Sequence, residues 1–494
     1  MAIPAGGSKA RPYAVRARIV ESMDSLDTPV SELRPTLDRL RAAWQRNRPD
    51  ARQRLDDLAR LREAFTAGRD AMLDAIAADF GHRSVHETLL SDAMTVTAEI
   101  DHLRSRLRGW MKPRRVGSGW RLWPARAQVR HEPVGVVGVM SPWNYPVNLA
   151  LIPLATAIAA GNHAYLKPSE HTPRTSQWLR DLLAAVFPAD RVAVALGDAA
   201  LGAAFSALPF DHLVFTGSTA VGRKVMAAAA PHLTPLTLEL GGKSPAIVAT
   251  DFPVEQAAAR LATGKWLNSG QTCIAPDYVL VDHARRDALV DALREQARAR
   301  YGALEDASDF TRIINEGQYR RLRGYLDDAR ERGLEVIELV AIDPVRAEAE
   351  RMIAPTIVLD PGDDARVMQD EIFGPILPVR GYRDLDEAIA YVEARDRPLA
   401  LYPFSRDRAT VEKILGRIVA GGVTVNDTLL HFAAGNLPFG GVGASGMGQY
   451  HGRAGFDAMT KAMPVLWQPR WAASDLLKPP YRGFVDRMVR FLSG

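Results

Sequence analysis

The chain contains a single cysteine, Cys273, in 494 residues, and this scarcity excludes several classes of protein. One cysteine cannot form an intramolecular disulfide, and it cannot build a thiolate metal site by itself. Long apolar runs are absent too, because no segment reaches the roughly 18 uninterrupted apolar residues of a membrane span. We therefore expect no disulfide framework, no metal site and no membrane-spanning helix.

A marked excess of one charge is also missing. Lys and Arg total 62 and Asp and Glu total 58, which gives a formal net charge of +4, and the two signs are interspersed. This balance argues against a nucleic-acid partner. The N-terminus lacks the apolar stretch of a signal peptide, since Arg11, Arg16 and Arg18 interrupt it. Together with the lone cysteine, this predicts a cytoplasmic protein.

What the chain does contain is an ordinary globular composition, 47% hydrophobic and 24% charged, in a length that predicts two or three domains. Leu37, Leu40 and Trp44 recur at spacings of three and four, which predicts helices from residue 33 to about 80. A further helical stretch is expected from about 85 to 110, and residues 1–30 are expected to form a flexible arm.

From residue 134 onward, short apolar runs alternate with helical stretches. Runs without polar alternation are typical of strands buried on both faces, and strands separated by helices indicate parallel sheets. The expected fold class is therefore α/β. The predicted strands are 134–140, 164–167, 192–196, 212–216, 278–281, 355–359 and 377–380.

Two segments fall outside this pattern. Residues 120–131 alternate large apolar residues with Arg and Gln, which suggests an exposed β-hairpin. Residues 478–494 place six apolar side chains among Arg482, Arg487 and Arg490, which predicts a basic amphipathic helix. Packing of this helix against its own subunit or a neighbour is the favoured interpretation, and contact with a membrane surface is the alternative.

Small polar residues precede Cys273 and predict a turn that presents the sulfur, although a buried small hydrophobe is the alternative. Glu239 lies at an apolar strand end, before a glycine pair. Burial of an anion is costly, so its pKa should rise, which suits a general base near neutral pH. A carboxylate paired with Lys243 is the alternative.

Polar residues also follow several predicted strands, at the edge where ligand crevices of α/β sheets form. Asn144 stands between two prolines and could donate a hydrogen bond to an oxyanion, or simply stiffen a turn. Gly217 opens a helix whose free amides could bind phosphate, or it belongs to an ordinary turn. Lys167 and Glu170 could hold ribose hydroxyls or form a surface ion pair.

Taken together, these segments resemble the NAD(P)-dependent aldehyde dehydrogenase superfamily from about residue 50 to about residue 465. Three stretches carry most of the likeness: TLELGGKSPAIV at 237–248, GQTCIAPDYVL at 270–280, and VNDTLLHFAAGNLPFGGVGASGMGQYHG at 425–452. They are similar to the class 3 branch, and within it to the bacterial coniferyl aldehyde dehydrogenases.

The resemblance implies a role for each matched residue. Cys273 corresponds to the nucleophile and Glu239 to the general base, and Asn144 with the backbone N–H of Cys273 corresponds to the oxyanion hole. The implied cofactor-binding residues are Lys167, Ser169, Glu170, Gly217, Ser218, Gly222, Glu371 and Phe373. The cofactor is expected to be NAD, with NADP possible, because Glu170 should repel a 2′-phosphate.

Four aromatic residues stand beside these motifs: Trp143, Tyr145, Trp266 and Phe439. They could line a channel for a flat or long apolar aldehyde, or they could be core residues. The expected reaction is oxidation of an aromatic aldehyde such as coniferaldehyde, or of a medium-chain aliphatic aldehyde, to the acid through a cysteine thiohemiacetal and thioester.

Two other functions remain as alternatives. An acylating enzyme would pass the acyl group to coenzyme A, and Glu239 disfavours it because no base for water is then needed. A non-catalytic protein on the same fold would be expected to have lost Cys273, Glu239 or Asn144, and all three are present.

The resemblance also implies a homodimer and a division of the chain. Residues 31–110 and 132–240 would form the NAD-binding domain, 241–425 the catalytic domain, 111–131 and 426–465 the oligomerisation and bridging segments, and 466–494 a C-terminal tail.

Overall fold

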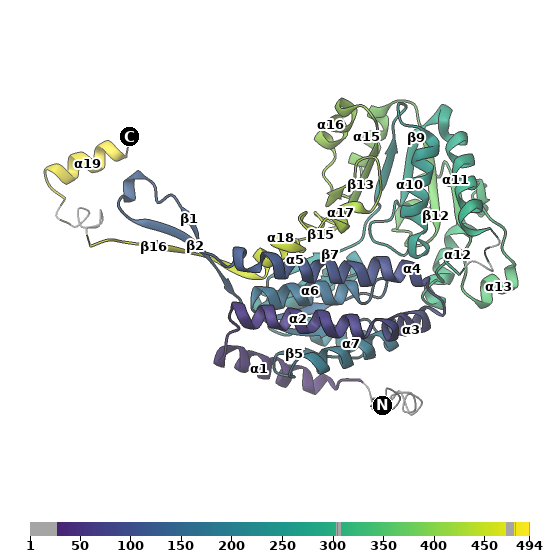
Figure 1. Cartoon of the computed structure of the whole chain (residues 1–494). Helices are drawn as coiled ribbons and strands as arrows, with labels where there is room; N and C mark the ends of the chain where they lie inside the picture. The colour runs from purple at the N-terminus through teal and green to yellow at the C-terminus, as the bar shows by residue number, and fades with distance from the viewer. Residues whose placement is uncertain (1–26, 303, 305–307, 471–478, 480, 494) are drawn as a thin grey trace, which may run out of the picture.

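The computed structural model describes residues 27–302, 304, 308–470, 479 and 481–493 (Figure 1). The arm expected at residues 1–30 therefore lies outside the described residues as far as residue 26. The first helix, α1, begins at Val30.

The N-terminal part is helical, as its apolar spacing predicts. Leu37 and Leu40 of α1 are completely buried, and Asp50 caps α2 by accepting a hydrogen bond of 2.8 Å from the N–H of Gln53. The elements are α1 Val30–Arg46, α2 Ala51–Ala67, α3 Arg69–Phe80, α4 Val85–Thr88, a π-helical turn Leu89–Ala93 and α5 Met94–Trp110. Figure 1 shows these helices layered on one side of the molecule, together with α6 and α7.

A six-stranded sheet follows, in the order β15-β7-β6-β3-β4-β5. All its strand pairs are parallel except the one with β15, and every residue of β3, β4 and β6 is buried, which explains their uninterrupted apolar runs. Its strands are β3 Val136–Met140, β4 His163–Lys167, β5 Val192–Val194, β6 His212–Thr216, β7 Leu236–Glu239 and β15 Gly446–Met447. Its helices are α6 Asn148–Ala160, α7 Pro173–Val186, α8 Ala199–Ser206 and α9 Thr219–Ala229.

The strand order of this sheet reverses next to β3. The chain runs from β3 to β4 and β5 on one side, then crosses to β6 and β7 on the other. Loops at the carboxyl ends of two such strands diverge and leave a crevice. Asn144 follows β3 and Gly217 follows β6, so both lie at this switch point.

A second sheet has seven strands, in the order β10-β11-β12-β9-β8-β13-β14. Its strands are β8 Pro245–Val248, β9 Tyr278–Asp282, β10 Val336–Glu338, β11 Thr356–Leu359, β12 Ile376–Tyr382, β13 Ala400–Phe404 and β14 Gly422–Val423. Its helices are α10 Val254–Trp266, α11 Arg286–Tyr301, α12 Glu316–Glu331, α13 Pro344–Ala349, α14 Arg366–Gln369, α15 Leu385–Glu393, α16 Arg408–Arg417 and α17 Leu430–Ala433. The α/β fold class is thus confirmed.

The third sheet is antiparallel and projects from the body (Figure 1). It contains β1 Arg114–Val116, β2 Arg126–Pro133 and β16 Thr460–Trp467, which follows α18 Gly452–Ala458. The hairpin expected within residues 120–131 is wrong in its bounds, because Trp120–Leu122 is a 3₁₀ turn and only β2 falls in that segment. The main partner of β2 is β16, over eight residue pairs, and no local pattern shows a partner 330 residues away.

The C-terminal helix α19, Phe484–Leu492, confirms the expected amphipathic helix, but its apolar face is not covered by the chain's own body. Phe484 is 66% exposed and Phe491 is 84% exposed, and Figure 1 places α19 beyond the end of the third sheet. Among the described residues, α19 therefore does not pack on the chain's own body, and packing on a neighbouring subunit, the other half of the favoured interpretation, stays a prediction. No helix among those residues has the length and apolar character to cross a membrane.

Candidate active site

A cavity of about 740 Å³ opens between the two large sheets. Three polar residues that reach it come from different elements: Asn144 after β3, Glu239 at the end of β7, and Cys273 between α10 and β9. Asn144 and Cys273, which are 129 positions apart in the sequence, thus face one space. The lining also includes Thr216, Gly217, Ser218, Gly241, Gly242, Lys243, Glu371 and Phe373.

Cys273 follows a tight turn, as its small polar neighbours predict. Asn268 and Ser269 both have φ of 52° and Gly270 has φ of 72°, so three successive residues adopt left-handed backbone conformations. A Cβ on Gly270 would lie 2.2 Å from the carbonyl oxygen of Gly374, so only glycine fits there. The turn leaves Cys273 partly exposed at the cavity.

The thiol of Cys273 is not ionised readily in this structure. Burial raises its pKa to about 12, and the charges of Glu371 and Glu239 act in the same direction. A thiol in this environment must lose its proton before it can attack, since the thiolate is the nucleophilic form.

Glu239 has the environment of a general base. Both of its carboxylate oxygens are buried and make no hydrogen bond with any described residue. Burial raises its pKa well above the ordinary value. The alternative of pairing with Lys243 does not occur, because the Lys243 ammonium contacts Asp277 and donates to the carbonyls of Val367 and Asp370 at 2.9 Å.

Asn144 is held by its backbone and leaves its side chain available. Its carbonyl oxygen accepts hydrogen bonds from Nη1 of Arg83 and Nδ2 of Asn268, each at 3.0 Å. The side chain is buried, reaches the cavity, and has no hydrogen bond within the described part of the chain. The rigid turn and the free amide donor therefore occur together.

Part of the expected cofactor set also reaches the cavity. Gly217 and Ser218 line it at the start of α9, where the Ser218 side chain caps the N–H of Val221 and the N–H groups of Thr219 and Ala220 come before the first intrahelical hydrogen bond. Glu371 lines it too; burial, then the charge of Asp277, raises its pKa to about 8, and its Oε1 has no partner among the described residues. Phe373 packs edge-to-face on Trp143, with ring centroids 5.3 Å apart.

Four expected cofactor residues do not line this cavity: Lys167, Ser169, Glu170 and Gly222. Lys167 Nζ lies 3.0 Å from Glu170 Oε2, so the two form the ion pair that was the alternative interpretation, with the lysine buried. Gly222 serves close packing, because a Cβ there would lie 2.5 Å from Leu240 Cδ2.

Of the four aromatic residues expected in the channel, only Trp143 lines the cavity. The Tyr145 hydroxyl is 2.5 Å from Oγ1 of Thr272, next to the cysteine. Trp266 is 1% exposed and packs on Tyr301, and Phe439 is buried in an aromatic cluster. The last two are core residues here.

The sequence did not single out several charged residues at or behind this site. Lys265 does not line the cavity; it is completely buried, its Nζ lies 3.9 Å from Oδ1 of Asp277 without a hydrogen bond to a described residue, and burial lowers its pKa to about 8. The position of this lysine in an apolar segment of α10 could have indicated a buried charge. Four arginines also line the cavity, and their scattered positions give no pattern: Arg223, Arg321, Arg395 and Arg397.

The cavity suits a dinucleotide. Its volume lies within the range of small-molecule sites, it combines a helix N-terminus with basic side chains, and the buried Glu371 oxygen lacks a partner. Among the described residues, no group of three or more His, Cys, Asp or Glu side chains could hold a metal ion.

Comparisons with known proteins agree with this geometry. The model of the aldehyde dehydrogenase family matches residues 38–465. A probable coniferyl aldehyde dehydrogenase of Pseudomonas aeruginosa is 49% identical over 461 residues, covering 93% of this chain and 96% of the relative. The coniferyl aldehyde dehydrogenase of a Pseudomonas strain is 45% identical over 465 residues, covering 93% and 96%.

Solved structures show the same fold. The substrate-bound state of Staphylococcus aureus AldH matches with a TM-score of 0.88 and 36% identity, covering 94% of this chain and 100% of that chain. A Mycobacterium tuberculosis aldehyde dehydrogenase complexed with NAD⁺ matches with a TM-score of 0.79 and 27% identity, covering 90% and 91%. The chain therefore belongs to the aldehyde dehydrogenase family and is an NAD(P)-dependent enzyme that oxidises an aldehyde to the carboxylic acid.

Proposed function

We propose that Cys273, Glu239 and Asn144 carry out this oxidation. The observation that carries the proposal is that a thiol, an unpartnered carboxyl group and a free amide donor from three elements open on one cavity. Buried polar groups without partners destabilise a fold, and they concentrate where function requires them.

The cofactor would bind on the side of the cavity formed by the start of α9. Gly217 and Ser218 would face the phosphates, and Glu371 and Phe373 would hold the nicotinamide end. When bound, NAD(P)⁺ supplies the two-electron acceptor for the reaction. We propose NAD as the cofactor, with NADP possible, on the family resemblance, because Glu170 is paired with Lys167 and does not line the cavity.

The reaction begins with transfer of the Cys273 proton. This proton passes to solvent through the open cavity. The Glu239 carboxylate is kept for the hydrolytic step, in which its raised pKa makes it a stronger base than an ordinary glutamate. The sulfur then attacks the aldehyde carbon and forms a thiohemiacetal. The Asn144 amide and the N–H of Cys273 donate to its oxyanion, and one such donor contributes roughly 2.7–4 kcal/mol.

Loss of hydride converts the thiohemiacetal to a thioester on Cys273. Glu239 then takes a proton from water, the resulting hydroxide attacks the thioester carbon, and the acid leaves as the thiol is restored. Oxidation and hydrolysis are thereby separated into two easier steps. A coenzyme A acceptor would make the base for water superfluous, so the unpartnered Glu239 favours hydrolysis.

The proposed substrate is an aromatic aldehyde such as coniferaldehyde, with medium-chain aliphatic aldehydes second. Two similar proteins bear the name of that substrate, and the Trp143 and Phe373 rings provide an apolar face at the cavity. We also propose a homodimer, because apolar side chains are exposed on the third sheet and α19, among them Trp467 and Phe491. Light scattering tests the dimer.

The function is tested by recording NADH absorbance with coniferaldehyde, hexanal and octanal, each with and without coenzyme A. We expect turnover that needs no coenzyme A and is highest with coniferaldehyde. Cys273→Ala should abolish turnover while NAD still binds. Turnover that depends on coenzyme A would overturn the hydrolytic assignment, and turnover by Cys273→Ala would overturn the nucleophile.

A further inference from the structure

Arg83 is a charged residue that the proposed mechanism does not use, yet it is buried beside the site. It lies in the loop between α3 and α4, and its side chain is completely inaccessible. A buried guanidinium is costly unless an anion and hydrogen bonds compensate it. The contacts of Arg83 therefore indicate which parts of the structure it stabilises.

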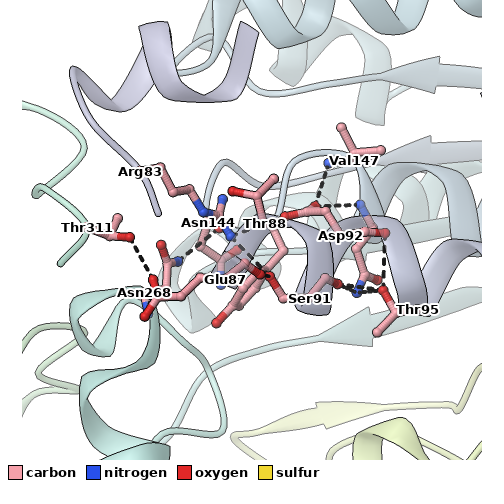
Figure 2. A network of polar contacts seen from close by, with 12 residues as sticks. Arg83, Glu87, Thr88, Ser91, Asp92, Thr95, Asn144, Val147, Asn268 and Thr311 are labelled. Carbon is pink, nitrogen blue, oxygen red and sulfur yellow. Dashed lines mark hydrogen bonds and ion pairs between the residues drawn. The ribbon is translucent and has the colours of Figure 1, made fainter. Parts of the chain in front are cut away.

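These contacts converge on the loop that carries Asn144 (Figure 2). Arg83 Nη2 lies 3.1 Å from Oδ2 of Asp92, which is also completely buried, and Nη1 donates to the carbonyl of Asn144 at 3.0 Å. The guanidinium also stacks against the rings of Phe80 and Tyr145, at 4.9 and 5.1 Å from their centroids. A planar group with this many fixed neighbours has little freedom to move.

Asp92 holds the following part of the same loop. Its Oδ1 accepts hydrogen bonds from the N–H groups of Val147 at 3.2 Å and Asn148 at 2.9 Å, where α6 begins. The Arg83–Asp92 pair thus binds the Asn144 carbonyl and the start of the next helix, and so fixes the backbone on both sides of Tyr145.

The same carbonyl is joined to the cysteine turn. Nδ2 of Asn268 donates to the Asn144 carbonyl at 3.0 Å, and the Asn268 N–H donates to Oε2 of Glu87 at 3.1 Å. That Glu87 oxygen also accepts from Oγ1 of Thr311 at 2.7 Å. One carbonyl oxygen therefore connects the turn before Cys273 with the loop of Asn144, and Arg83 is the second donor to it (Figure 2).

We propose that Arg83 is a positioning residue that fixes the Asn144 amide relative to the Cys273 sulfur, by holding the backbone carbonyl that the two loops share. This inference rests on the proposed role of Asn144 as an oxyanion donor. A misplacement of about 1 Å can cost about 100-fold in rate, so a residue that touches no reacting atom can still control the chemistry.

The test is a double-mutant cycle with Arg83→Lys and Asn144→Ala, because alanine keeps the carbonyl that Arg83 binds and removes only the amide. Lysine is a single point charge and cannot bind both Asp92 and the carbonyl as the guanidinium does. The readout is the single-turnover rate of NADH formation with NAD and coniferaldehyde, alongside the Kd of NAD.

We expect Arg83→Lys to lower that rate about 30- to 100-fold with the native Asn144, and less than about 3-fold in Asn144→Ala. Asn144→Ala alone should lose about 100- to 1,000-fold. The Kd of NAD should change little in every variant. The conservative Asp92→Asn, which retains the Oδ1 acceptor for α6, is the second variant and should show the same dependence on Asn144.

Arg191→Lys is the matched control. Arg191 is buried, pairs with Asp57 at 3.0 Å, and donates to the carbonyl of Asn162 at 2.6 Å, away from the cavity. Arg191→Lys should reduce thermal stability as Arg83→Lys does, and should leave the single-turnover rate of NADH formation per folded molecule unchanged.

Equal losses from Arg83→Lys in both backgrounds would overturn the positioning role, because a general structural defect does not depend on the Asn144 amide. Equal rate losses from Arg191→Lys would overturn it as well. Full activity of Asn144→Ala would instead refute the proposed oxyanion donor, and the cycle separates that result from the others.

Discussion

Two buried polar regions of this chain differ in how their charges are satisfied. Beneath α2, the Arg191 cluster consists of Asp57, Asn162 and Arg191, and each member is paired: Nε and Nη2 of Arg191 bind Asp57 at 3.1 and 3.0 Å, and Nη1 binds the Asn162 carbonyl. At the cavity wall, both Glu239 oxygens and Oε1 of Glu371 have no hydrogen-bond partner among the described residues.

This difference distinguishes buried polar groups that stabilise the fold from buried polar groups that take part in the reaction. A buried ion pair with complete hydrogen bonding fixes elements against each other, and loss of one partner is costly. Buried polar groups without partners reduce stability, and the raised pKa values of Glu239 and Glu371 record that cost. We therefore expect substitutions at the Arg191 cluster to change stability and those at the cavity wall to change chemistry.

The largest effect is expected at the cavity wall. Glu239→Gln keeps the size of the side chain and removes the base, so the steady-state rate should fall by about 10²–10⁴. We expect a rapid burst of NADH followed by slow turnover, because the thioester accumulates. Stopped-flow absorbance checks both phases, and equal slowing of burst and steady state would contradict the role in hydrolysis.

The next effect concerns the Arg191 cluster. Arg191→Met leaves Asp57 with Arg60, at 2.7 Å, as its one charged partner within the described part of the chain, and should lower the free energy of unfolding by about 3–5 kcal/mol. Urea unfolding followed by circular dichroism measures this change. The rate per folded molecule should stay within about twofold of the wild type, and a large loss of rate at unchanged stability would break the comparison.

The smallest expected effect is a pH dependence of the rate at which Cys273 is labelled. Because the pKa of Cys273 is raised to about 12, the thiolate fraction in the cofactor-free enzyme should rise about tenfold per pH unit from pH 7 to 9. Iodoacetamide labelling of the single cysteine should therefore speed up about 100-fold over this window without levelling off. A plateau near pH 8 would show that the thiol is already ionised.

A structural feature could be predicted from the sequence when it depends on neighbouring residues, and could not when it depends on residues far apart in the chain. The parallel strands were predictable because burial on both faces leaves an apolar run, and β6 has the predicted bounds, 212–216. The approach of Cys273, Glu239 and Asn144 was expected only through the resemblance to a family, since strand order brings them together and no local pattern encodes it.

Other features could not be predicted from the sequence, for the same physical reason. The pairing of β2 with β16 joins residues 126–133 to 460–467, and the Arg83 network joins residues 83 and 92 to 144 and 268. Such contacts depend on tertiary packing, which a window of sequence does not contain. Trp266 stands beside the cysteine motif and is buried against Tyr301, so its place in the sequence did not decide between the channel and the core.

The most direct test of the central claim is to quench Glu239→Gln during its NADH burst with coniferaldehyde and to map the protein by peptide mass spectrometry. The account predicts one acyl adduct, on the peptide that contains Cys273, in an amount equal to the burst. A burst without an adduct, or an adduct on another residue, would contradict it.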